Sequence, residues 1–237
     1  MKEKSKPQEN PSIITVMAFV VTLLLLIQKD YFTYYKARAV ILILILTSFT
    51  AILSIEIIII PFVIASCLFG YLEIVDRILW KSPLFSWMFT VEDFSGTYEG
   101  TQENIILKEV ERDDENKKIY REYREHLQLK IIIHQTGSDI KANFFYYNTN
   151  DGKSSKSEDA QVSVTKTADG CHYILTCLHG DIGILENGGH HETVVLKYIK
   201  QGSGYCLEGG YYDNRKFHAR GMFIGLKKVS SEVRHPF

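Results

Sequence analysis

The chain has 237 residues, with 27 Lys and Arg against 28 Asp and Glu, for a formal net charge of −1. That length allows one or two domains, and the balanced charge excludes the strongly basic surface that binding to DNA or RNA polymers usually needs. Residues 1–91 hold the long apolar runs and carry 8 basic against 6 acidic side chains, whereas residues 92–237 carry 19 against 22. A membrane segment followed by a soluble domain is therefore expected.

The first apolar run, Ser12–Ile27, has no charge and follows a Lys-rich start. A secretory signal peptide is one interpretation, but no small-x-small cleavage site follows the run. A retained membrane helix over about 12–28 is favoured. Sixteen residues at about 1.5 Å each span only about 24 Å of a core of about 30 Å, so flanking residues are expected at the interface.

The second apolar run extends from Ala37 to Leu72 and is too long for one straight span. Pro61 offers a break, because proline removes a helical hydrogen bond. The pattern predicts a second transmembrane helix over about 39–60, followed by a juxtamembrane amphipathic helix. Its apolar face would consist of Leu68, Leu72, Val75 and Leu79, with Glu73, Asp76 and Arg77 elsewhere.

Glu56 lies within the second predicted span. An acidic residue at the bilayer centre costs roughly 2.5–3.5 kcal/mol, which the surrounding Ile and Leu offset. Either Glu56 makes a polar contact between copies of a homo-oligomer, or its side chain reaches the interface. Two spans would place both ends of the chain on the side with more flanking Lys and Arg, the cytoplasm, whereas three spans would separate them.

From Phe94 onward the apolar residues recur with period two, and Gly, Asn, Asp and Ser cluster between the runs. About eight sequential strands joined by short turns predict an all-β soluble domain, an antiparallel up-and-down β-barrel over residues 92–237. The expected strands are Phe94–Gln102, His126–Gln135, Asp139–Tyr147, Ala160–Thr167, His172–His179, Glu192–Ile199, Tyr205–Tyr212 and His218–Val229.

The charged stretch Glu103–Glu125 leaves two alternatives open, an extension of the first hairpin or a surface helix. At the start of the barrel, Gly96 and Gly100 would let the first strand bend, and Tyr98 would be an inward aromatic plug. Alternation also assigns Arg220, Met222, Ile224 and Leu226 to one inward face.

No catalytic motif is present, and neither a cofactor nor an enzymatic activity is predicted. His190 and His191, with His172 or His179, are conceivable metal ligands, but loop histidines without defined spacing are usually only polar. The four cysteines, Cys67, Cys171, Cys177 and Cys206, show neither disulfide nor zinc spacing, which favours a reducing compartment.

Ten of the tyrosines lie in residues 92–237. A tyrosine offers a flat face to a nucleobase and a hydroxyl to a polar edge, and arginine pairs its donors with phosphate oxygens. The candidate ligand-binding residues are Arg220, Tyr146, Tyr205 and Tyr211. The structural alternatives are that the tyrosines fill the barrel and that Arg220 closes its end.

Two predicted membrane helices, an amphipathic joint and a β-domain that opens with Gly96-Thr97-Tyr98-Glu99-Gly100 resemble the two-transmembrane, β-strand-rich effectors of CBASS-type bacterial anti-phage systems. Relatives tend to have Trp in place of Tyr98. The resemblance implies a lipocalin-like barrel that binds a cyclic dinucleotide made during infection. It further implies that the helices then assemble in the bacterial inner membrane, disrupt it and cause cell death.

Two other functions fit the same organisation. One is a membrane-tethered, lipocalin-like binder or carrier of an apolar small molecule. The other is a membrane assembly factor whose barrel holds no ligand. An apolar carrier would have little use for Glu56 or for an inward Arg220.

Overall fold

The computed structural model describes residues 29–53, 70–112, 118–181, 190–201, 204–214 and 220–233. The chain divides into two compact units, and each is described by itself below. The first comprises Met1–Glu92 together with Thr136–Asp139, and the second comprises Asp93–Gln135 with Ile140–Phe237.

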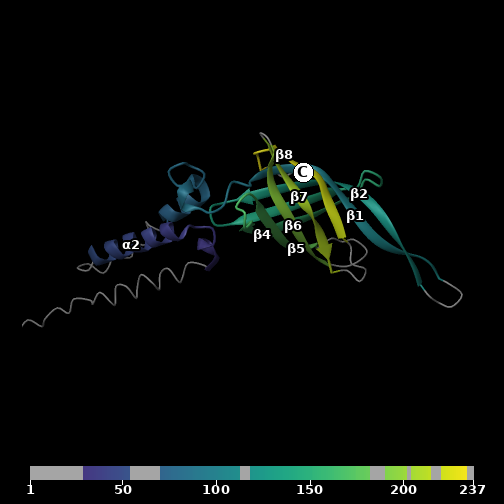
Figure 1. The fold of residues 1–237 in the computed structure, drawn as a ribbon, viewed down its shortest axis with the longest axis horizontal. Helices are drawn as coiled ribbons and strands as arrows, with labels where there is room; N and C mark the ends of the chain where they lie inside the picture. Colours follow the sequence, from purple (N-terminus) through teal and green to yellow (C-terminus); the bar gives the residue numbers. More distant parts are fainter. Residues whose placement is uncertain are drawn as a thin grey trace, which may run out of the picture. The chain divides into compact units, whose positions relative to one another are not determined.

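The second unit is a closed barrel of eight antiparallel strands, in which each strand pairs with the next and β8 pairs with β1 (Figure 1). This confirms the predicted up-and-down β-barrel. The strands are β1 (Gly96–Arg112), β2 (Lys118–Gln135), β3 (Ile140–Tyr147), β4 (Ser154–Lys166), β5 (Tyr173–Asp181), β6 (His190–Gln201), β7 (Gly204–Asp213) and β8 (Arg220–Ser230).

The first hairpin is much longer than its apolar pattern indicated. β1 continues to Arg112 and β2 begins at Lys118, so the described residues of the charged stretch form strands rather than a surface helix. β4 likewise begins at Ser154, well before the predicted Ala160. The β4 extension is polar, and the hairpin extension mixes apolar and charged residues without a regular period of two, so neither shows the alternation by which a sequence reveals a strand.

Side chains fill the barrel interior in the predicted alternation. On β2 and β3, Ile131, Ile133, Ile140 and Phe144 are at most 1 % exposed. Tyr98 on β1 is fully buried, and its hydroxyl donates a hydrogen bond of 2.8 Å to the backbone oxygen of Phe94. The predicted aromatic plug at Tyr98 is therefore confirmed.

The two glycines of the opening motif permit close approach of β8 to β1. A Cβ on Gly100 would lie 2.7 Å from the backbone oxygen of Ile224. Gly96 has a φ of +136°, and a Cβ there would lie 2.5 Å from the backbone oxygen of Ser230. The barrel thus closes where this motif lacks side chains.

The first unit contains short helices. They are η1 (Lys29–Phe32), α2 (Ala37–Leu53), the π-helical turn η2 (Val75–Leu79), which continues a helical turn at residues 70–74, and η3 (Ser86–Met88). None of the helices in the described part of the chain combines the length and apolar character needed to cross a membrane. The first predicted span, Glu56 and the end of the second predicted span lie outside the described residues.

A small core holds this unit together. Tyr35 and Phe89 form a β-bridge, and the amide of Lys36 donates to the oxygen of Met88 at 2.6 Å. Leu72 and Val75, predicted on the apolar face of an amphipathic helix, are buried in this core with Ala39 of α2. That face is thus covered by protein. The same segment exposes Tyr71, Ile74 and Ile78 instead.

Candidate functional site

A groove of about 900 Å³ lies on the outer wall formed by β6, β7 and β8. In the strand register Gly210 lies between Val195 on β6 and Met222 on β8. Because Gly210 has no side chain, the wall is recessed between these two outward apolar residues, which are 44 % and 64 % exposed. A Cβ on Gly210 would lie 2.3 Å from the oxygen of Gly221, so a side chain could enter the floor only if the sheet shifted.

The polar side chains of the groove lie on either side of this floor. Arg220 pairs with Tyr212 of β7 on one side and with Ile105 of β1 on the other, and both Arg220 and Tyr212 are exposed. On the other side of the floor, Lys197 on β6 lies directly opposite Glu208 on β7 in the strand register. The lining therefore combines two cationic side chains, one carboxylate and an exposed phenol ring.

Arg220 points outward, which corrects the prediction of an inward arginine. Gly225 has a φ of +66°, and the pairing of β8 with both neighbours shifts register beside it. A bulge reverses the facing of the residues before it. Phe223 and Leu226 are therefore buried at 5 % and 0 % exposure, whereas Met222 and Ile224 face solvent with Arg220.

Of the four predicted ligand-binding residues, Arg220 and Tyr211 line this groove, whereas Tyr205 and Tyr146 do not. Tyr211 lies beneath the groove floor and donates 2.9 Å to Asn104 Oδ1 inside the barrel. Tyr205 is half-buried and stacks on Tyr198. Tyr146 is buried and borders a different, smaller hollow of about 620 Å³ on the wall of β1–β3.

Tyr212 and Lys197 are groove residues that the sequence analysis missed. Tyr212 is 66 % exposed and lies next to the predicted Tyr211, on the opposite face of β7. One sequence signal was available. Glycines occur consecutively at 209 and 210 on β7 and again at 221 on β8, and glycine within a strand often marks a close backbone approach.

Inside the barrel, Tyr211 reaches Asn104 because Gly221 leaves room for its ring. A Cβ on Gly221 would lie 2.2 Å from Tyr211 Cε1. Gln102 donates to the same Asn104 oxygen, and all three side chains are buried. Gln102 Oε1 has no hydrogen-bond partner within the described residues. This polar cluster ties β1 to β7 behind the groove.

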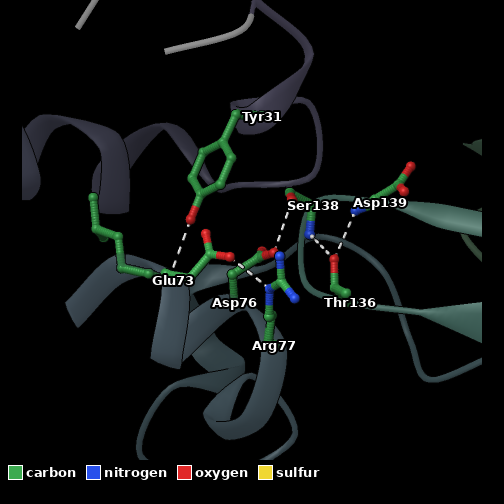
Figure 2. Close-up of polar contacts among 8 residues, drawn as sticks. Tyr31, Glu73, Asp76, Arg77, Thr136, Ser138 and Asp139 are labelled. Carbon is green, nitrogen blue, oxygen red and sulfur yellow. Dashed lines mark hydrogen bonds and ion pairs between the residues drawn. The ribbon is translucent and has the colours of Figure 1, made fainter. Parts of the chain in front are cut away.

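A second polar cluster lies in the first unit, around Asp76 (Figure 2). Asp76 was predicted on the polar side of its helix but is only 5 % exposed. Ser138 Oγ donates 2.9 Å to Asp76 Oδ2, and the amide of Gly137 donates 2.9 Å to the backbone oxygen of Asp76. Asp76 Oδ1 has no hydrogen-bond partner among the described residues.

Burial raises the pKa of the Asp76 carboxyl, against the opposing effect of the hydrogen bonds from Ser138 and Thr136. The negative charge of Glu73 raises that pKa further. Arg77 forms an ion pair with Glu73, with 2.6 Å between Nε and Oε1 (Figure 2). Burial also raises the pKa of Tyr31 to about 12, and the Tyr31 hydroxyl donates 3.2 Å to the oxygen of Leu72. The cluster thus anchors the turn at 136–139 within the first unit.

The described residues contain no candidate metal site, and Cys177 is buried among them. No group of three or more His, Cys, Asp or Glu side chains is placed there to hold a metal ion. The side chains of His179, His190 and His191 lie outside the described part of the chain. Cys177 is buried, and burial raises the pKa of its thiol to about 12, so little reactive thiolate forms at neutral pH.

Comparisons with protein-family models, with curated proteins and with solved structures found no match. The function of this chain therefore has to be inferred from its own residues.

Proposed function

We propose that this protein is a membrane-anchored effector whose β-barrel binds a cyclic dinucleotide, and that the bound form assembles and disrupts the bacterial inner membrane. The observation that supports a ligand of this class is the outer groove, where Arg220 and Tyr212 lie on adjacent strands next to the recess at Gly210. In this proposal the protein carries out no reaction.

The chemistry of the groove suits a phosphorylated aromatic ligand. The Arg220 guanidinium offers paired donors to phosphate oxygens, and Lys197 adds a second cation. The Tyr212 ring, exposed beside Arg220, offers a stacking surface to a base. A hollow of about 900 Å³ lies within the usual range for small-molecule sites, about 300–1,000 Å³.

The barrel interior favours this proposal over the apolar-carrier alternative. The interior positions hold tightly packed side chains, including Tyr98, Ile131, Phe144, Leu175 and Leu196, each at most 1 % exposed. An apolar ligand inside the barrel would have to displace some of them. The outer groove can accept a ligand without repacking the core.

The membrane part of the proposal rests on the sequence. Helices over about 12–28 and 39–60 would anchor the protein, with the N-terminus and the barrel in the cytoplasm. Two short helices cannot enclose a pore, so disruption requires a homo-oligomer. Glu56 would make a polar contact between copies. The ligand promotes assembly only if it binds the assembled form better than the separate copies.

A thermal-shift experiment on the full chain in mild detergent tests the ligand class. The panel contains cyclic di- and trinucleotides, a linear dinucleotide and fatty acids. A ligand at 100 times its dissociation constant adds about 2.7 kcal/mol, which raises the melting temperature by about 5–10 °C. Unchanged melting with every cyclic nucleotide would contradict the proposal, and a rise with fatty acid alone would support the carrier.

The same preparation reconstituted in liposomes tests the membrane role. Addition of the stabilising nucleotide is expected to release an encapsulated dye, and Glu56→Gln is expected to change this release while the nucleotide still raises the melting temperature. Release by Glu56→Gln equal to that of the wild type would remove Glu56 from the proposed contact.

A further inference from the structure

The first hairpin extends beyond the rest of the barrel as a two-stranded ribbon (Figure 1). β2 pairs with β1 along its length but with β3 only from Gln128 onward. β1 pairs with β8 only as far as Ile105. Within the described residues, no third strand pairs with β2 over residues 118–127, so one backbone edge of β2 is open there.

An open edge presents N–H and C=O groups that can pair with another strand, and proteins usually interrupt such edges. The β1 side of the ribbon is interrupted by a bulge between Glu109 and Glu111. The β2 side is regular over the same region. A ribbon of only two strands also gains stability when further strands join it.

The sequence along this edge is self-complementary about Tyr123. Glu122 and Arg124 flank Tyr123, and Arg121 and Glu125 come next, so the charges are opposite at equal distances on the two sides. Tyr120 and His126 lie three residues from Tyr123 on its two sides, so the same pairing would place them opposite each other. Only a strand running antiparallel to its own copy would match these residues with one another.

We propose that the open edge of β2 binds the same edge of a second copy of this chain. A twofold axis at Tyr123 places residues at equal distances from it directly opposite each other, on the same face of the joined sheet. Arg121 of each copy then faces Glu125 of the other, and Glu122 faces Arg124. The two ribbons form a four-stranded antiparallel sheet with Tyr123 against Tyr123 at its centre.

The contacts within one copy leave this edge available. The side chains at 120–124 are exposed, Tyr123 by 40 %. The side chain of Arg121 is exposed, so a carboxylate of a second copy can reach it. Glu125 accepts a hydrogen bond from Asn148 through Oε1, and a second copy's Arg121 can approach its other oxygen. Within its own copy Arg124 contacts Glu103 at 2.9 Å and lies 3.9 Å from Glu122, while its side chain stays 64 % exposed and can also reach Glu122 of a second copy.

Cysteine cross-linking of the full chain in mild detergent, without nucleotide, tests the geometry. Tyr123→Cys is made in a Cys171→Ser background, because Cys171 is exposed. Opposite residues of an antiparallel pair have Cα atoms about 4.5–5.5 Å apart, within reach of a disulfide. A cross-linked dimer is expected from Tyr123→Cys, and none above the parent from Leu107→Cys, which is equally exposed on β1. Equal cross-linking at the two positions would overturn the proposal.

Charge reversal tests it independently. Arg121→Glu alone and Glu125→Arg alone should each raise the dimer dissociation constant by about tenfold or more, because like charges then face each other twice. Mixing the two variants should restore dimers, since the mixed pair again matches opposite charges. Melting curves show whether each variant is folded. If the separate variants dimerise like the wild type, or if folded variants do not recover on mixing, the proposal is wrong. Neither result depends on the ligand groove.

Discussion

Tyr98→Phe isolates the contribution of one buried hydroxyl at the start of the barrel. The Tyr98 side chain is fully buried, and its hydroxyl donates 2.8 Å to the backbone oxygen of Phe94. Burial raises the pKa of Tyr98 above its ordinary value, so the hydroxyl keeps its proton and remains a donor at neutral pH. The substitution keeps the ring but removes the donor to that carbonyl.

Losing a buried donor in this way costs about 1–3 kcal/mol of the free energy of unfolding. For a chain of this length each kcal/mol shifts the melting temperature by about 2–4 °C, which gives an expected loss of about 2–12 °C for Tyr98→Phe. Tyr98→Ala also removes the ring and should cost about 3–5 kcal/mol. Tyr147→Phe is the matched control, because Tyr147 is 45 % exposed and should change stability by less than about 0.5 kcal/mol.

The assay is thermal unfolding of the full chain, followed by the far-ultraviolet circular dichroism of the β-sheet. Hydrogen exchange over residues 94–98 would show whether the loss is local to the start of β1. If Tyr98→Phe melts at the same temperature as Tyr147→Phe, the hydroxyl does not stabilise the barrel, and Tyr98 acts through its ring alone.

Two further predictions concern the first unit. Burial raises the pKa of Asp76 in the folded state, so the free energy of unfolding should fall as the pH rises above the ordinary value of 3.8, until the folded carboxyl has lost its proton. In melting curves between pH 4 and 8, the stability of the wild type relative to Asp76→Asn should therefore decrease as the pH rises; a constant or rising difference would refute this assignment. Gly137→Ala should destabilise the unit by about 1–3 kcal/mol, because its Cβ would lie 2.3 Å from Phe89 Cε1 and 2.8 Å from Asp76 Oδ1. Gly70→Ala is the control, because no atom lies within 4 Å of the added Cβ. Equal melting temperatures for the two variants would show that the turn at 136–139 accommodates the Cβ without loss of stability.

The barrel was predictable because inward apolar residues recur at every second position of its strands. Ile131 and Ile133, or Ile140 and Phe144, mark such an inward face, although Ile132 and Phe145 on the other face are buried as well, and glycine-rich turns separate the strands. Tyr98 could be placed inward for the same reason. The outer ends of β1, β2 and β4 carry no such regular pattern, so their lengths became apparent only from the hydrogen-bonded register.

The site was less predictable because its geometry depends on a single backbone irregularity. The alternation on β8 was extrapolated through Gly225, but the bulge beside this residue turns Arg220 outward. Asp76 was misplaced for a different reason. A helical pattern places it on a polar side, and only the turn at 136–139 buries it. A local bulge thus interrupts the period on β8, whereas a contact distant in sequence overrides the helical period at Asp76.

The most direct test of the proposed function is equilibrium binding of a labelled cyclic dinucleotide to the full chain and to variants of the groove. Loss of a charge-assisted contact to phosphate, worth about 1.5–3 kcal/mol, should weaken binding about 10- to 150-fold in Arg220→Ala. Tyr212→Ala should also weaken binding, and Tyr147→Ala on the other wall should bind like the wild type. Equal affinity of Arg220→Ala, Tyr147→Ala and the wild type would contradict the placement of the ligand in the groove of β6–β8.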